Sequence, residues 1–162
     1  MTENFIKLNK DDVLRLEIRT NEGEPTGEYL EFDLEDIELP MKFQELVDKN
    51  KKNRQFLKNQ FVIIEKREDV KGKKLLSKNE EDKIKAINEF FKKEVEIYNM
   101  FLGENGVEKL LNGRKLGWTS LQEIDDIIAK QIMPHIDMTM EKITEKVKSK
   151  YGIPETEQEV LK

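Results

Sequence analysis

The chain has 162 residues, of which 39% are charged and 36% hydrophobic, and its formal net charge is -5. This acidic balance argues against a general nucleic-acid or anionic-membrane binder, because affinity for phosphate depends on Lys and Arg. The chain has no Cys, which excludes disulfides and thiolate chemistry. The stretch MTENFIKLNKDD has no apolar signal-peptide core, and no apolar run approaches the roughly 20 residues of a membrane span. We therefore expect a cytoplasmic protein with neither a nucleic-acid nor a membrane partner.

The first 39 residues predict a small β region. Hydrophobic and charged residues alternate in the stretches 13–19 (VLRLEIR) and 28–34 (EYLEFDL), a period typical of half-buried strands. The connecting stretch 21–27 (NEGEPTG) is rich in turn-forming residues. We expect an antiparallel hairpin here, to which residues 5–8 (FIKL) could add a third strand.

The chain from residue 40 onward reads as helical. Apolar residues recur at three- and four-residue spacings and predict helices over about 40–66, 78–102, 105–112 and 119–149. A polar gap at Asn50 and Arg54 leaves open whether the first of these is two helices. The fold class is therefore α+β, mainly α, with an N-terminal hairpin or three-stranded sheet followed by a bundle of three to four helices. We divide the chain into a β region (1–39), a helical domain (40–150) and a flexible tail (151–162).

The predicted helix ends carry recognisable signals. Ser77–Glu80 (SKNE) and Thr119–Gln122 (TSLQ) both fit the capping-box pattern, in which two side chains satisfy free amides at a helix start. Pro134 predicts a kink or break near 130–134, because proline removes a helical hydrogen bond. Four glycines mark the corner between the second and last long helices and are expected to be structural turns: Gly103, Gly106, Gly113 and Gly117.

Candidate chemistry is sparse, and we expect no catalytic residue, no metal and no cofactor. His135 is the only histidine and lacks a Glu-x-x-His partner, so it is a weak metal candidate. Asp125 and Asp126 are adjacent and point apart on a helix, unlike an acid–base pair. Residues 33–38 hold a cluster of acidic side chains that leaves open a metal-using enzyme as a minor alternative.

Large hydrophobic residues collect around the end of the second long helix. They form either plain core or, in part, a docking surface, since aromatic residues are favoured interface anchors. Our candidate partner-binding residues are Phe91, Tyr98, Phe101, Leu102, Val107, Leu110, Leu111 and Trp118.

Residues 96–113 (EIYNMFLGENGVEKLLNG) resemble a segment of the tail assembly chaperones of long-tailed phages and prophages of Gram-positive bacteria. In those proteins a helix ends in a hydrophobic residue followed by Gly-Glu. A turn of the type Gly-x-x-x-Lys-Leu/Phe-Phe/Leu-Gly and a last long helix then follow. Here residues 102–104 (LGE) and 106–113 (GVEKLLNG) match that pattern, and the wider plan is similar over residues 28–150.

The resemblance implies a non-enzymatic chaperone that binds the tape-measure protein, a long helical rod, and keeps it soluble during tail assembly. The tail-tube protein is a possible further partner, and self-association is expected because hairpin edges are exposed. The alternative function is a structural tail or capsid-accessory protein that self-associates and remains in the particle.

Overall fold

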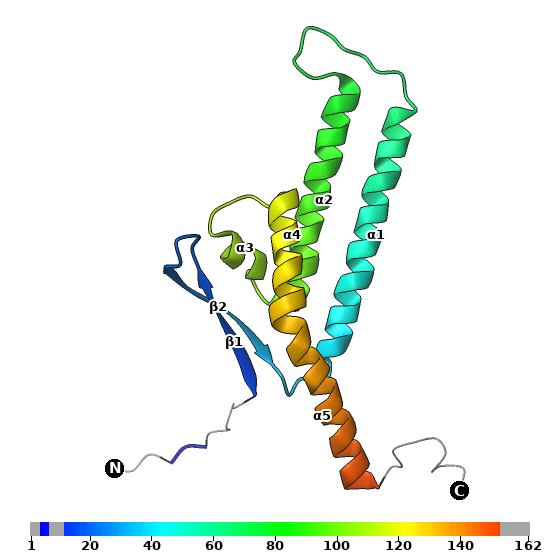
Figure 1. Ribbon diagram of the computed structural model, residues 1–162. Helices are drawn as coiled ribbons and strands as arrows, with labels where there is room; N and C mark the ends of the chain where they lie inside the picture. Colours follow the sequence, from blue (N-terminus) through cyan, green and yellow to red (C-terminus); the bar gives the residue numbers. More distant parts are fainter. Residues whose placement is uncertain (1–3, 7–11, 153–162) are drawn as a thin grey trace, which may run out of the picture.

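The computed structural model of the protein describes residues 4–6 and 12–152 and confirms a mainly helical α+β fold (Figure 1). A two-stranded sheet is followed by two long antiparallel helices, a short helix and a bent final rod. The elements are β1 (Val13–Arg19), β2 (Pro25–Asp33), α1 (Leu39–Glu65), α2 (Lys78–Leu102), α3 (Gly106–Leu111), α4 (Trp118–Ile127) and α5 (Met133–Tyr151). A π-helical turn, η1 (Ile128–Ile132), joins α4 directly to α5.

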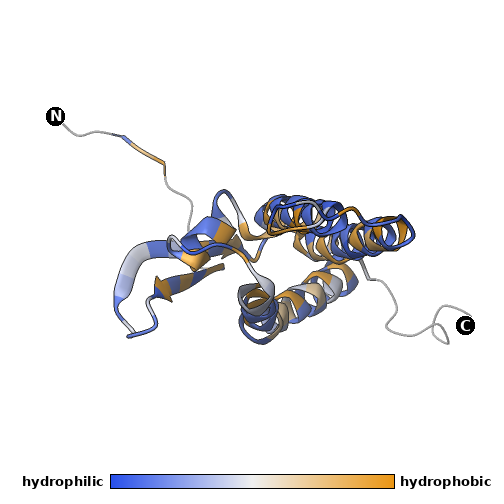
Figure 2. Cartoon of the chain, turned by 90° about the horizontal axis from the view of Figure 1, so that it is seen from above, coloured by the Kyte–Doolittle hydropathy of each residue, from blue (hydrophilic) through white to orange (hydrophobic). Residues whose placement is uncertain are grey.

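The sheet is an antiparallel hairpin in which Leu14 pairs with Phe32 and Leu16 with Leu30. Its strands alternate between hydrophobic and hydrophilic residues, and it lies to one side of α1, α2 and α4 (Figure 2). The third strand is not formed at Phe5 and Ile6, which are exposed; the rest of that stretch, residues 7–8, lies outside the described residues.

The core lies where the sheet, α3 and α4 cover one end of the α1–α2 pair. The Phe101 ring packs 5.5 Å from the Phe32 ring of β2 and 5.7 Å from the Phe43 ring of α1, measured between centroids. Phe101 therefore joins three elements in one apolar cluster. Helix α1 is continuous, so the polar gap does not divide it into two helices. No helix within the described ranges has the length and apolarity needed to cross a bilayer.

One of the two predicted capping boxes is confirmed and the other is wrong. Ser77 Oγ accepts a hydrogen bond from the Glu80 amide, and the Glu80 carboxylate accepts one from the Ser77 amide, both at 3.1 Å. Helix α4 instead begins after Gly117, whose amide donates to Ser120 Oγ at 2.8 Å. Thr119 already lies in the first helical turn, so it cannot serve as the cap.

The far end of the α1–α2 pair extends beyond α4 (Figure 1). Polar links hold it together: Asn79 Nδ2 donates to the carbonyl oxygens of Ile64 at 3.1 Å and Arg67 at 3.3 Å. The Asn79 amide in turn donates to the Asp69 carboxylate at 2.9 Å. These bonds tie the end of α1 to the start of α2 across the connecting loop.

Candidate binding groove

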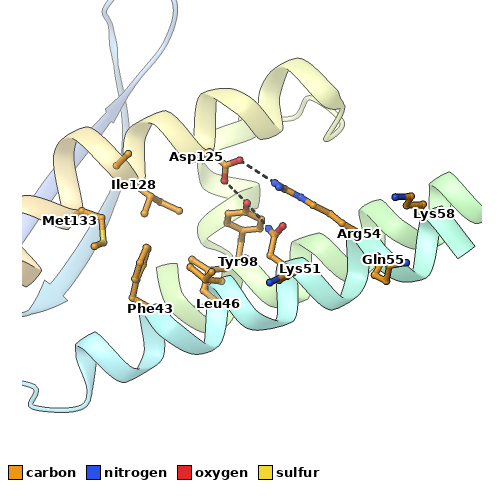
Figure 3. Close-up of a pocket in the computed structure, with 13 residues that line it drawn as sticks. Phe43, Leu46, Lys51, Arg54, Gln55, Lys58, Tyr98, Asp125, Ile128 and Met133 are labelled. Atoms are coloured by element: carbon orange, nitrogen blue, oxygen red, sulfur yellow. Dashed lines mark hydrogen bonds and ion pairs between the residues drawn. The ribbon is translucent and has the colours of Figure 1, made fainter.

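A groove of about 520 Å³ runs between α1 on one side and α4, η1 and α5 on the other (Figure 3). Its two ends differ in chemistry. Apolar side chains line the end nearer the sheet, and polar and basic side chains line the other. The apolar lining comprises Phe43, Leu46, Val47, Ile128, Ala129 and Met133.

The basic end is formed by three residues of α1, namely Lys51, Arg54 and Lys58. Their spacing of three and four residues places them along one side of the helix. Arg54 reaches across to Asp125 of α4, with 3.6 Å between the guanidinium and carboxylate (Figure 3). Within the described residues, neither Lys51 nor Lys58 makes an ion pair. The groove therefore has one apolar end and one end with unneutralised positive charge.

A polar layer extends inward from the groove: Asn50, Tyr98 and Asp125 line it, and Asn53 and Glu94 lie behind them. Asn50 Nδ2 donates to the Glu94 carboxylate at 2.9 Å and to Tyr98 Oη at 2.7 Å. Asn53 Nδ2 donates to the other Glu94 carboxylate oxygen at 3.0 Å and to the Phe90 carbonyl at 3.1 Å. The Tyr98 hydroxyl donates to the Asp125 carboxylate. These bonds join α1, α2 and α4 through the interior.

Burial changes the protonation of this layer. Glu94 is completely buried, and this loss of hydration raises the pKa of its carboxyl to about 7, while the hydrogen bond from Asn53 partly opposes the rise. Burial, with the adjacent Asp125 carboxylate, also raises the pKa of Tyr98. Because Glu94 has no exposed surface, a ligand in the groove would meet Asp125 and Arg54 rather than Glu94.

The π-helical turn η1 forms part of the groove wall. Pro134 lies just after it and has no amide hydrogen to donate, so the regular α-helical ladder cannot continue through this point. A kink or break was predicted near 130–134; the helix does not break there, and the departure from α-helix is this π-helical turn over residues 128–132. Ile128 and Ile132 are nevertheless buried, and the turn thus keeps the apolar side of the rod facing the core.

The predicted partner-binding residues belong mainly to the core. Phe101, Leu102, Val107 and Leu111 are buried, because α3 and the sheet cover this side of α2. They offer no surface to a partner, so replacing Phe101 with a charged residue would test folding. Tyr98 is also buried, but it packs between α1 and α4 and lines the groove.

The other three predicted binding residues are more accessible. Leu110 and Phe91 are partly buried against the core, and Trp118 is 57% exposed. The Trp118 ring packs 4.6 Å from the Phe91 ring and 5.5 Å from the Phe90 ring, measured between centroids. This aromatic group fixes the start of α4 on α2, and it lies away from the groove.

The four glycines are at turns, for different reasons. Gly103 ends α2 with φ 102° and ψ 174°, a positive φ outside the left-handed helical region. Gly106 is needed for space, because a Cβ there would lie 2.6 Å from Leu102 Cβ. Gly113 has φ 86°, but the residue that caps α3 is Asn112. Gly117 caps α4 with extended backbone that any residue can adopt.

The acidic cluster after β2 serves the local backbone. Asp33 and Asp36 accept hydrogen bonds from the amides of Glu35 and Glu38, both at 3.0 Å, and Lys42 donates to Asp36 at 2.8 Å. The Lys42 hydrogen bond lowers the pKa of Asp36. Over residues 4–6 and 12–152, no three His, Asp or Glu side chains converge as metal ligands.

Sequence reasoning missed the polar layer, although signals for it exist. Asn50 falls in the noted polar gap, and Glu94 lies four residues before Tyr98, on the same apolar stripe of α2. A polar residue on an apolar stripe indicates either a solvent-facing break or a buried partner.

Comparisons with protein-family models, curated proteins and solved structures found no match for this chain.

Proposed function

We propose that this protein is a non-enzymatic phage tail assembly chaperone that holds a helical segment of the tape-measure protein in the host cytoplasm. The observation that carries the proposal is the groove, which leaves an apolar wall uncovered between α1 and the α4–η1–α5 rod. A helical client with an apolar stripe would bury that stripe there, as amphipathic helices do in hydrophobic grooves.

The side chains at the apolar end suit this role. Val47 is 48% exposed on α1, and Ala129 is exposed opposite it on η1, so a ligand can reach both. Phe43 and Met133 are partly buried against the core and line the groove beside them. Side chains that are already packed in place favour binding, because little ordering of the protein is needed when the client arrives.

The resemblance of residues 96–113 to tail assembly chaperones supports the same function from the sequence. That segment forms the end of α2 and all of α3, where Val107 and Leu111 are buried. Its role in this protein is to hold α3 and the sheet against α2. The resemblance therefore bears on how the scaffold is built, and the groove supplies the contact with the client.

The alternative is a structural tail or capsid-accessory protein that self-associates and remains in the particle. The β hairpin favours it, because a sheet of two strands leaves both edges without strand neighbours in the described residues. Such edges can pair with another copy. Mass spectrometry of purified particles separates the two functions, since a chaperone should be missing from them.

The proposed function is tested by co-expressing the protein with a tape-measure protein from the same genome. We expect Val47→Asp and Ala129→Asp to leave the fold intact and to reduce recovery of soluble client by about tenfold, because each puts a charge in the apolar end.

Val62→Asp is the matched control. Val62 is 45% exposed on the same helix, about 22 Å from Val47 along α1, and lies outside the groove. Equal losses for Val47→Asp and Val62→Asp, or no loss for either, would contradict client binding in this groove.

A further inference from the structure

We infer that the groove selects a client helix whose apolar turns are followed by carboxylates. This inference deepens the proposed function and rests on it. The apolar end would take hydrophobic side chains, while Lys51, Arg54 and Lys58 would pair with acidic side chains further along the same helix. The ligand is thus an amphipathic helix with an acidic half, rather than any apolar helix.

The charge pattern on α1 carries the selection. Lys51 and Lys58 make no ion pair within the described residues, although the whole chain has a net charge of -5. Arg54 is held only loosely by Asp125 at 3.6 Å and is itself exposed. Two free cations and one exchangeable cation on one edge attract carboxylates and repel a basic helix.

The spacing along the groove sets the pattern in the client. From Leu46 at the apolar end to Lys58 at the basic end, α1 rises about 18 Å, or somewhat more than three helical turns. A client helix lying along α1 would place apolar residues in two turns and acidic residues in the following two (Figure 3). Its carboxylates would then face Lys51, Arg54 and Lys58 together.

A second apolar depression, between α1 and α2, does not share this charge pattern. It is lined by Phe56, Phe90 and Ile97, and its rim carries both lysine and glutamate side chains. Mixed charges at the rim give no preference for an acidic or a basic ligand. Of these two depressions, only the groove between α1 and the α4–η1–α5 rod has a charge that identifies an occupant.

A nucleic acid is a poorer match than a peptide carboxylate. Half of the groove is apolar and offers a sugar-phosphate backbone no polar partner. An amphipathic helix can carry both carboxylates and an apolar stripe. The carboxylates fit the basic half of the groove, and the stripe fits the apolar half.

The test uses a designed helical peptide of about 18 residues, roughly 27 Å long, with leucines in its first two turns and glutamates on the same side in the next two. Its twin carries lysines in place of the glutamates. We expect the acidic peptide to bind the full chain about tenfold more tightly than its twin at low salt, with the preference shrinking at high salt. Lys51→Glu/Lys58→Glu should remove or reverse the preference.

Lys85→Glu/Lys92→Glu is the matched control, because these exposed lysines have the same seven-residue spacing on α2 and lie outside the groove. Equal binding of the two peptides, both displaced by the tape-measure client, would overturn the acidic selection and leave the proposed function standing. If neither peptide bound and Val47→Asp left the recovery of soluble client unchanged, both the acidic selection and the proposed function would be overturned. Tighter binding after deletion of residues 153–162, or displacement by a DNA oligonucleotide, would also overturn the inference.

Discussion

The two ends of the α1–α2 pair are held together in different ways. At the end near the sheet, helices α1 and α2 are covered by β2, α3 and α4, and large apolar side chains such as Phe101 fill the space. At the far end, in the part of the chain that the structure describes, the helices contact each other and the connecting loop, and Val62, Ile63 and Ile84 remain exposed. There the connections are hydrogen bonds from Asn79 and exposed ion pairs.

This difference shows that one helical pair can be stabilised by buried apolar contacts at one end and by polar contacts at the other. Burial on several sides supplies most of the folding free energy at the covered end. Exposed ion pairs such as Arg67–Asp82 contribute little, so the far end depends on helix capping and on the Asn79 bonds. We therefore expect substitutions at the covered end to cost several times more than those at the far end.

The largest effect is expected at Phe101. Phe101→Ala should lower the free energy of unfolding by about 3–5 kcal/mol, because it empties the contact between the sheet and both long helices. Ile84→Ala, at a side chain that is 52% exposed at the far end, should cost below about 1 kcal/mol. Chemical denaturation of both variants measures the contrast, and similar costs would contradict it.

The polar layer should make stability depend on pH. The pKa of Glu94 is about 7 in the folded protein against an ordinary value of 4.5, so between these values the folded state keeps a proton that the unfolded chain releases. Stability should therefore fall as pH rises from about 4.5 to 7, by at most about 3 kcal/mol. Carboxyls with a lowered pKa, such as that of Asp82 beside Arg67, act in the opposite sense and at lower pH.

Glu94→Gln is the comparison for this effect, since it keeps the size of the side chain and removes its titration. Urea unfolding of both proteins at several pH values should show a slope between pH 4.5 and 7 in the wild type that is missing in the variant. Parallel pH profiles would show that Glu94 does not titrate in this range.

A smaller effect is expected at Gly106. Gly106→Ala should cost about 1–3 kcal/mol, because its Cβ would clash with Leu102 Cβ at 2.6 Å and push α3 from α2. Gly117→Ala is the control, since nothing lies within 4 Å of its added Cβ. Thermal unfolding should separate the two variants, and equal melting temperatures would refute the steric argument.

The smallest effect is expected at the far end. Ser77→Ala should cost about 1 kcal/mol, because both hydrogen bonds of the capping box start or end at Ser77. Thr119→Ala should change the free energy of unfolding by less than about 0.5 kcal/mol, because Thr119 does not cap α4. If Thr119→Ala proved as costly as Ser77→Ala, the assignment of the α4 start would be wrong.

Much of the fold could be predicted because local signals determine it. The capping box at Ser77 and the apolar stripe of α2 specify that helix without reference to the rest of the chain. The N-terminal alternation likewise specifies the hairpin. The cap of α4 was misplaced by two residues, at Thr119 instead of Gly117, since the sequence does not reveal whether a hydroxyl accepts from a preceding amide or a following one.

The candidate site could not be predicted in the same way. Whether Phe101 faces a partner or the core depends on where α3 and the sheet lie, and periodicity along α2 does not contain that information. The groove combines α1 residues with Asp125 and Met133, far along the chain. Only the packing of α5 and η1 beside α1 brings these side chains together.

The polar layer also sets the register between the two long helices. Asn50 and Asn53 of α1 meet Glu94 at a single height along the pair. If α1 slid by one turn, about 5.4 Å, apolar side chains could still find apolar neighbours, but the Glu94 carboxyl would be left buried without its partners. A purely apolar contact between the helices would tolerate such sliding, whereas the polar layer allows this pair only one alignment. The same alignment fixes where the α1 side of the groove lies.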